Sequence, residues 1–430
     1  MEETSLTSDV NWSKPKLIFF RFLCTYLILF NLPFPLRFIP YLRALVDPYE
    51  NTFDLLNFWV AKNILGINNN LTRFYTHSGD TTLNYVEIVT FLMLALVITL
   101  VWTLLGWKAR NYQRLDQLLR IYVRYSLAAT MLSYGAIKVI KSQFPSPSLE
   151  RLIEPIGNAS PMGLAWTFMG SSESYNIFTG GAEMLGGILL AFPQTATLGA
   201  LVSAGVISNI VMLNFSYDVP VKIFSSHLFL TCIFLITPEL KRLINVFILN
   251  RTVEKIETPP LFDKVWQNQL AQLVKTCFLI LIVTVSLFAA SYERNANGDL
   301  SIKSPLYGIW EVEEFEFDGK ILPPLLTDEI RWRRVIFDSP ERLLISSMTE
   351  NQGNFILSFN KQLEKFSLTS NMNPEFKAEF SIEALEDTVI RLNGNFSNHK
   401  IIAKLRRVDE TKFLLKSRGF HWISEEPFNR

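Results

Sequence analysis

Residues 180–190 read GGAEMLGGILL, an apolar stretch suited to a membrane helix and interrupted by one carboxylate, Glu183. A charged side chain at bilayer depth costs roughly 2.5–3.5 kcal/mol even on permissive insertion scales. Another group must therefore pair with Glu183, protonate it or use it in chemistry. Three cations from other apolar segments are candidates, and we favour Lys138 or His227 over Arg21. The alternative is a helix-to-helix hydrogen bond made by the protonated carboxyl group.

The composition indicates an integral membrane protein. Of 430 residues, 49% are hydrophobic and only 19% are charged, and the mean hydropathy is +0.21. A net charge of +1 without a basic block gives no indication of nucleic-acid binding. The three cysteines, Cys24, Cys232 and Cys277, all lie in apolar segments and form no C-x-x-C motif. We therefore expect neither thiol–disulfide chemistry nor a disulfide scaffold.

About seven segments are apolar and long enough to span about 30 Å of hydrocarbon, which takes about 20 helical residues each. They are expected near residues 16–33, 84–106, 119–140, 173–192, 196–213, 220–237 and 268–290. A short amphipathic helix is expected around residues 52–66. The N-terminus is acidic and polar and has no cleavage-site pattern, so the first segment is expected to be a retained helix.

The basic residues of the loops predict the orientation. The loops after the second and sixth segments are rich in Lys and Arg, whereas the alternate loops are poorer. Seven spans place both rich loops on one side, and basic loops are typical of the cytoplasmic side. We therefore expect a multi-pass protein of the cell membrane, most simply a bacterial inner membrane. Its N-terminus is then cytoplasmic, and everything after Tyr292 is extracytoplasmic.

From about residue 300 the pattern changes to alternating apolar and polar residues, which is typical of strands. The strands are expected at residues 308–317, 330–338, 342–349, 354–360, 364–370, 376–383, 387–393, 399–407 and 411–418. Eight or nine short strands without a helix favour a sandwich or a small closed barrel. The opening Gly308-Ile309-Trp310 resembles the Gly-x-Trp that begins the first strand of lipocalins, which implies a lipocalin-like barrel.

Two motifs in the membrane part carry a family resemblance. Residues 132–138 read LSYGAIK, and residues 180–190 follow with a Glu before a Gly-Gly pair. Together they resemble the DoxX-like four-helix membrane family over roughly residues 115–240. The resemblance implies a four-helix core and an association with quinone-linked sulfur oxidation or oxidative-stress complexes. This chain adds a span before the core, a span after it and a β domain.

Several polar residues are predicted to meet in the outer half of the membrane. Tyr134 and Lys138 are four residues apart and share a helix face, although Lys138 could simply extend to the interface. Glu183 is expected about 14 Å deep. His227 suits a proton carrier, or it satisfies a neighbouring hydroxyl or carbonyl group. The predicted catalytic residues are Glu183, His227 and Lys138.

The predicted ligand-binding residues are Tyr134, Asn209, Asn214, Tyr175 and Trp166. The stretch from Trp166 to Tyr175 is either a segment that covers the site or an aromatic belt at the membrane interface. No nucleotide-binding glycine motif, metal-ligand motif or nucleophile elbow is present, and one membrane-embedded histidine is not enough for bis-His haem.

These patterns predict an α-helical polytopic membrane protein followed by an all-β domain. The expected domains are 1–114 (membrane helices and an outer loop), 115–240 (DoxX-like core), 241–299 (cytoplasmic connection and last helix) and 300–430 (barrel or sandwich). One functional hypothesis is a quinone-linked redox component, with membrane lipid, a quinone-like molecule and a partner subunit of a redox complex as its partners. The alternative is a non-enzymatic binding protein whose β domain holds an apolar ligand or a protein. A proton- or ion-coupled transporter is the weakest hypothesis, because no inverted repeat is evident.

Overall fold

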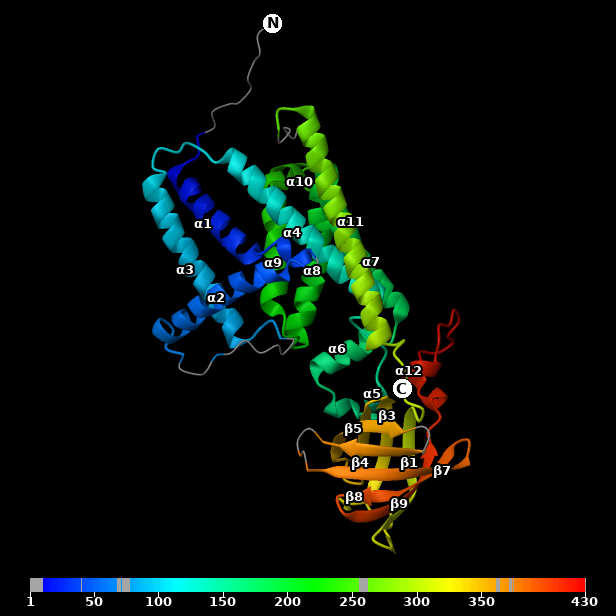
Figure 1. Ribbon diagram of the computed structural model, residues 1–430. Coiled ribbons are helices and arrows are strands. Elements are labelled where there is room, and N and C mark those ends of the chain that lie inside the picture. The colour runs from blue at the N-terminus through cyan, green and yellow to red at the C-terminus, as the bar shows by residue number, and fades with distance from the viewer. Residues whose placement is uncertain are drawn as a thin grey trace. The chain divides into compact units, whose positions relative to one another are not determined.

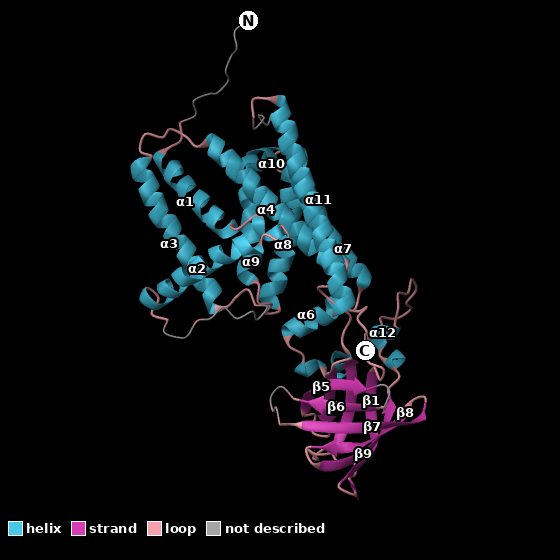
Figure 2. Ribbon diagram, in the orientation of Figure 1, coloured by secondary structure: helices cyan, strands magenta, loops and turns pink. Residues whose placement is uncertain are grey.

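The computed structural model describes residues 11–429 except 40, 68–70, 72–77, 255–261, 361–363, 371–372 and 374. The chain divides into two compact units. The first contains residues 1–143 and 174–291, and the second contains residues 144–173 and 292–430. The first unit is helical, and the second contains all the strands of the described chain (Figures 1 and 2).

Each expected span corresponds to a helix in the structure. The long helices of the first unit are α1 (Lys14–Asn31), α2 (Arg43–Asn63), α3 (Thr82–Leu105), α4 (Gln113–Val139), α7 (Glu173–Ala191), α8 (Ala196–Ser216), α9 (Lys222–Ile236) and α11 (Val265–Ala296). The short α10 (Leu240–Phe247) follows α9. The expected amphipathic helix near 52–66 is part of α2, which is longer and begins earlier. The last residues of α11 and the first residue of α7 belong to the second unit.

Five helical segments of the described chain are long and apolar enough to cross a membrane, which fits a membrane protein. They are Lys14–Phe38, Thr82–Leu105, Pro193–Ser216, Lys222–Phe247 and Val265–Ala296. The other two expected spans, α4 and α7, are helices but fall outside this set. Their sequences explain why, since α4 carries charged residues along its length and α7 combines Glu183 with polar residues and glycines.

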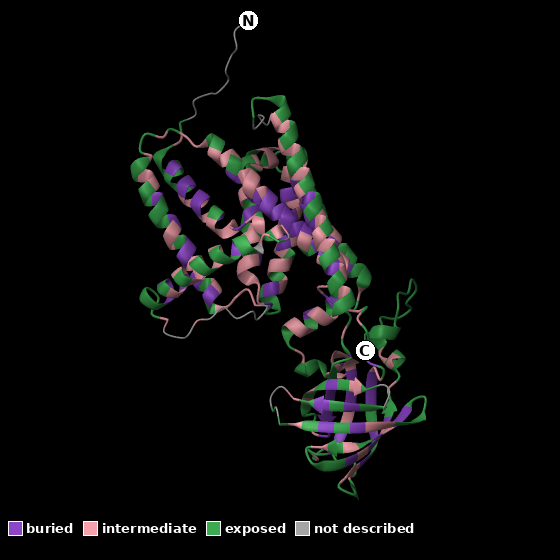
Figure 3. Ribbon diagram, in the orientation of Figure 1, coloured by how far each residue is buried: buried purple, intermediate pink, exposed green. Residues whose placement is uncertain are grey.

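The core of the helical unit is made of small and aliphatic residues from α4, α7, α8, α9 and α11. Ala128, Ala129, Leu190 and Ala200 are fully buried there, and Cys232 lies in the same cluster. Small residues let helix backbones approach closely in lipid, where no hydrophobic effect drives the helices together. This cluster is the dense central region of buried residues in Figure 3.

The second unit contains a closed antiparallel barrel. Its strands are β1 (Gly308–Phe317), β3 (Trp332–Ser339), β4 (Arg342–Ser347), β5 (Gln352–Asn360), β6 (Lys365–Thr369), β7 (Lys377–Glu386), β8 (Val389–Phe396) and β9 (His399–Arg407). Each strand pairs with the next, and β1 also pairs with β9 from Trp310↔Arg407 to Phe317↔Ile401. The short β2 (Lys320–Ile321) pairs only with β1. The closure excludes the open-sandwich alternative, and an eight-stranded up-and-down barrel fits the lipocalin-like expectation.

One expected strand is wrong. Residues 411–418 form a turn of 3-10 helix (Glu410–Lys412) and the short helix α12 (Leu414–Ser417) instead of a ninth barrel strand. The barrel is already closed by the pairing of β1 with β9, so neither of these strands has a free edge for another partner. The apolar residues of this segment therefore have no ladder to join.

Aromatic side chains fill the barrel interior. Phe315, Phe337, Phe366 and Phe380 are almost fully buried, and Trp332 packs against Phe315 at a ring-centroid distance of 5.5 Å. Buried and exposed residues alternate along β6, as expected for a strand with one face inward (Figure 3). The interior is therefore a packed aromatic core at this level of the barrel.

The connection between α4 and α7 folds with the barrel. It contains α5 (Leu149–Ile153) and α6 (Pro161–Gly170), and Leu149 is buried in a cluster with Ile309, Ile336 and Leu344 of the strands. Polar contacts join the same parts, since Asp299 accepts hydrogen bonds from the backbone N–H and the hydroxyl of Ser146. The domain boundaries expected from sequence placed this connection in the membrane core.

The aromatic core predicts a large effect for a single truncation. Replacing Phe380 with Ala should lower the free energy of unfolding of the barrel by about 3–5 kcal/mol, because it removes a fully buried ring. Urea unfolding followed by amide exchange of the barrel strands measures this. The control is Leu385→Ala on the same strand, where the side chain is 36% exposed. Equal effects of the two changes would contradict the packed core.

Candidate functional site

Glu183 is paired with Lys138. The Lys138 ammonium donates a hydrogen bond to Oε1 of Glu183, and the two residues are 7% and 1% exposed. Lys138 is the next-to-last residue of α4, and Glu183 lies in the middle of α7. Of the cations expected from the sequence, the structure thus brings Lys138 to the carboxylate.

Two glycines allow α4 and α7 to come close enough for this pair. A Cβ added at Gly180 would lie 2.6 Å from the carbonyl oxygen of Gly135, and one added at Gly135 would lie 2.7 Å from the carbonyl oxygen of Gly180. Backbone therefore contacts backbone at the point between Tyr134 and Lys138. Two turns further along α7 the close contact is repeated, since Gly187 lies against Ala128 and Leu132.

The carboxylate is only half satisfied. Within the described residues, Oε2 of Glu183 is buried and has no hydrogen-bond partner. A buried charge attracts its partner strongly, but an unpaired polar atom is costly in the same low-dielectric surroundings. The free oxygen is a position at which a proton or a hydrogen-bond donor would be stabilised.

A cavity of about 230 Å³ lies between α1, the segment that follows it, α4 and α9, and neither Lys138 nor Glu183 is among its lining residues. Tyr134, one turn before Lys138, lines it, and the Tyr134 ring lies 6.0 Å from that of Phe224 on α9. Its other lining residues are mixed, with aromatic rings such as Phe34 and polar groups such as Arg37 and Thr130. The cavity therefore offers both apolar surface and hydrogen-bonding groups.

His227 belongs to a different polar contact. Its Nδ1 lies 2.7 Å from the carbonyl oxygen of Ile223 and its Nε2 lies 2.6 Å from the Tyr26 hydroxyl. The carbonyl oxygen of Ile223 can only accept, so Nδ1 donates to it, and Nε2 shares the second hydrogen bond with the Tyr26 hydroxyl. Phe30, which lines the cavity, stacks on the imidazole at 4.1 Å. His227 therefore does not line the cavity but packs behind Phe30, and its side-chain hydrogen-bond partner is Tyr26 instead of Glu183.

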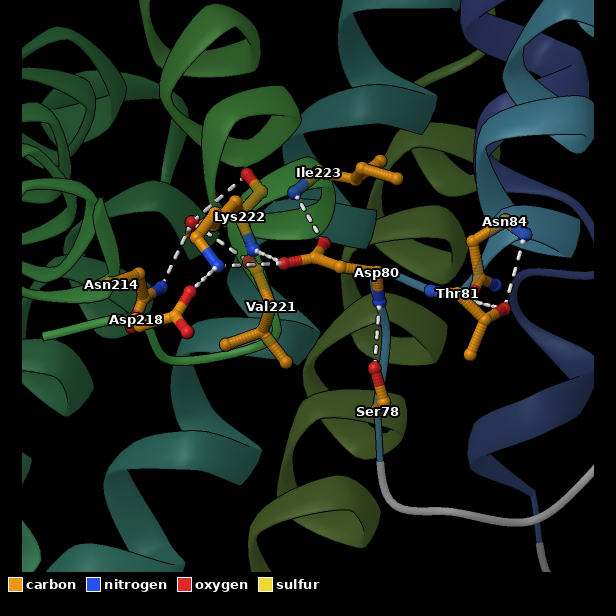
Figure 4. A network of polar contacts seen from close by, with 10 residues as sticks. Ser78, Asp80, Thr81, Asn84, Asn214, Asp218, Val221, Lys222 and Ile223 are labelled. Carbon is orange, nitrogen blue, oxygen red and sulfur yellow. Dashed lines mark hydrogen bonds and ion pairs between the residues drawn. The ribbon is translucent and has the colours of Figure 1, made fainter. Parts of the chain in front are cut away.

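Asn214, a predicted site residue, joins α8 to α9 in a polar network that also contains Asp80, which was not predicted from the sequence. Its amide donates to the hydroxyl of Ser225 at 3.0 Å, and both residues are buried. Beside it, the Asp80 carboxylate accepts hydrogen bonds from the backbone N–H groups of Lys222 and Ile223 at the first turn of α9 (Figure 4). A carboxylate at a helix N-terminus satisfies free N–H groups and complements the helix dipole.

The remaining predicted residues are not brought to the pair. Asn209 is exposed on α8, and Tyr175 is 39% exposed near the start of α7, with its ring against Phe178. Trp166 lies on α6 in the second unit, where it packs against Phe144 at 5.1 Å. Their ligand-binding roles stay predictions.

Arg21, the third cation considered for Glu183, has other partners. It donates to the Tyr112 hydroxyl, the Thr103 hydroxyl and the Gly106 carbonyl, and it is 3% exposed.

The sequence does indicate that Asp80 lies just before the start of a helix, because Thr81 and Asn84, which follow it, form the capping box of α3. Nothing in the sequence, however, indicates that Asp80 caps a second helix. In the part of the chain that the structure describes, no group of three or more His, Cys, Asp or Glu residues could hold a metal ion.

The close approach of α4 and α7 gives a prediction with a neighbouring control. Gly180→Ala should lower the thermal stability of the purified protein, because the new Cβ would overlap the Gly135 backbone. Gly181→Ala adds the same methyl group where no atom lies within 4 Å, so it should leave stability unchanged or raise it slightly. A thermal unfolding scan in detergent measures both, and equal melting temperatures would refute the packing argument.

Comparison with known proteins gives one informative relative. No family model matches the chain, and no solved structure matches it. Over 126 residues the chain is 35% identical to "Uncharacterized protein YwoB" of Bacillus subtilis (strain 168), a match that covers 29% of this chain and 79% of that protein. The chain therefore belongs to the family of this uncharacterized Bacillus protein.

Proposed function

We propose that this chain is a seven-span membrane protein whose outer half binds a quinone-like ring, with Lys138 and Glu183 as its proton-handling pair. The observation that carries the proposal is the buried, half-satisfied carboxylate of Glu183, whose partner Lys138 lies one helical turn from Tyr134 in the lining of a cavity of mixed polarity. Ionisable groups inside membrane proteins are costly and are usually retained for a function.

The contacts between helix ends support alternating helix directions. At one end, the backbone N–H of Trp12, before α1, donates to the carbonyl of Arg110, between α3 and α4. At the other end, Gly79 before α3 donates to the carbonyl of Pro220 before α9. Successive spans that cross in opposite directions would bring these ends together.

The second unit supports a crossing by α7. Residues 144–173 and 292–430 form one compact unit, so both lie on the same side of a membrane. An even number of crossings must then separate them. The apolar helices α8, α9 and α11 supply three, and α7 is the remaining long helix between the two segments. Because α7 packs closely against α4 through its glycines, a crossing by α7 implies that α4 crosses the membrane beside it.

Labelling from outside the cell tests this arrangement. In a chain without its native cysteines, a cysteine at Ser160 or Asp218 should react with a membrane-impermeant maleimide. A cysteine at Gln194, between α7 and α8, should react only after permeabilisation, because α7 carries the chain across. The same accessibility for positions 160 and 194 would show that α7 does not cross.

The cavity suits a flat ring that carries carbonyl oxygens. Aromatic residues supply stacking surfaces, whereas Tyr134 and Thr130 bring hydroxyl groups to the lining. Reduction of a quinone consumes protons at its carbonyl oxygens, and a Lys–Glu pair one helical turn from Tyr134 would supply or accept them. Electrons would come from a partner subunit of a redox complex.

The alternative, a non-enzymatic binding protein, has support only in its protein-partner form. The barrel interior at the level of Trp332 is filled by aromatic rings, which leaves less reason to place an apolar ligand there. A cavity of about 470 Å³ opens at the barrel surface beside Trp310, Glu386 and Arg407. This opening would suit a polar segment of another protein.

Analysis of bound molecules tests the quinone site. Protein purified in mild detergent should release a quinone on solvent extraction. Tyr134→Phe should reduce the amount retained, since it removes one hydroxyl from the cavity lining. Tyr217→Phe is the control, because Tyr217 is exposed to a similar degree (39% against 41%) and does not line the cavity. Absence of any quinone from the wild-type extract would sink the proposal.

Substitutions at Lys138 and Glu183 distinguish a structural role of this ion pair from a role in proton handling. Lys138→Met alone should destabilise the protein by about 3–5 kcal/mol, because it leaves a buried carboxylate unpaired. The double change Lys138→Met and Glu183→Leu removes both charges and should restore much of that stability. If the folded double variant retained quinone and turned it over as the wild type does, the pair would have no role in proton handling.

A further inference from the structure

We propose that the groove between α4, α7 and α11 binds an anionic phospholipid of the surrounding membrane. Its phosphate would lie against Arg124 and Lys275, and one acyl chain would fill the groove. The inference rests on the seven-span arrangement and is independent of the quinone site, which lies between α1, α4 and α9.

The groove is a cavity of about 240 Å³ with an almost entirely apolar lining. Its lining includes Leu132 of α4, Ile188 of α7, and Leu279, Ile280 and Val283 of α11. Ile280 is 61% exposed, so the groove opens outward from the helical unit. A hydrocarbon chain is the partner that such a surface meets in a bilayer.

Two cations stand at one end of this groove, around Tyr125, which also lines it. The Arg124 guanidinium carbon lies 5.1 Å from the centre of the Tyr125 ring, and Nζ of Lys275 lies 5.6 Å from it. Neither cation forms an ion pair with a carboxylate among the described residues. Nε of Arg124 is moreover buried and has no hydrogen-bond partner there.

An anion bound between Arg124 and Lys275 would stabilise these two neighbouring positive charges. The pair Arg124 and Lys275 repel each other, and Arg124 also loses hydration where it is buried. A phosphate group offers several acceptor oxygens and a negative charge to both cations, and a guanidinium binds phosphate with two parallel hydrogen bonds.

Arg124 and Lys275 lie five and seven residues inside the expected spans 119–140 and 268–290, about 8 and 10 Å deep at 1.5 Å per residue, and long basic side chains reach from such a depth to the lipid head groups. Arg124 is the last charged residue of α4 before the apolar run that ends near Lys138. Lys275 likewise precedes the apolar run 276–290 of α11. Both lie toward the end of the bundle that the basic loops predict to be cytoplasmic, where anionic lipids attract basic residues. A phosphate at that level has its acyl chains directed along the groove.

A lipid titration of the full chain in detergent tests this. Phosphatidylglycerol should bind and raise the melting temperature, because a ligand of the native state stabilises it, whereas phosphatidylcholine should have little effect. Arg124→Gln and Lys275→Gln should each weaken phosphatidylglycerol binding about fivefold, as expected for loss of one basic contact. Native mass spectrometry counts the lipid retained by each variant.

Two further variants make the result specific. Lys14→Gln is the matched control, because Lys14 also lies over an aromatic ring, that of Trp107, but lines no part of the groove. It should bind lipid as the wild type does. Ile280→Trp should obstruct the groove and weaken lipid binding while both cations remain.

Three outcomes would overturn the proposal. Phosphatidylcholine could stabilise the protein as well as phosphatidylglycerol does, which would remove the role of charge. Inorganic phosphate alone could reproduce the stabilisation, which would show a free-anion site without an acyl chain. Lys14→Gln could weaken binding as much as Arg124→Gln does, which would indicate general surface charge.

Discussion

The backbone contact between Gly135 of α4 and Gly180 of α7 is the constraint on which the candidate site depends. Without side chains at these two positions, the helices approach until the carbonyl oxygen of each glycine lies only 2.6–2.7 Å from where a Cβ on the other would be. That distance is short enough for Lys138 to reach Glu183, one turn away on each helix. A buried ion pair is costly to desolvate and tolerates little separation, so it needs this close packing.

The same two helices connect the membrane part to the barrel. The segment between them, residues 144–173, folds with the barrel through Leu149 and Ser146. The connection from α4 to α7 is therefore ordered by contacts within the second unit. In the proposed seven-span arrangement, both segments of that unit lie on one side of the membrane, and successive spans alternate in direction.

Three polar arrangements in the helical unit differ in how completely their hydrogen bonds are satisfied. The Lys138–Glu183 pair is buried and half satisfied, whereas the Asp80 cap of α9 and the Arg21 contacts are satisfied by backbone and hydroxyl groups. A fully hydrogen-bonded network stabilises one arrangement of the helices, whereas a network with an unpaired polar atom can bind a ligand or a proton. Arg124 and Lys275 belong to the second class, since they too lack a counter-ion among the described residues.

The sequence alone determined the positions of seven of the eight long helices and of the eight barrel strands, because hydrophobic period and length express local geometry directly. It also indicated that Glu183 needs a cation. Only the tertiary structure decided that Lys138 supplies it and that His227 turns to Tyr26, since periodicity orients a residue on its own helix but does not say which helices are neighbours. The extra strand expected at 411–418 was wrong for the same reason: whether a strand finds a partner depends on barrel closure, which involves residues about a hundred positions apart.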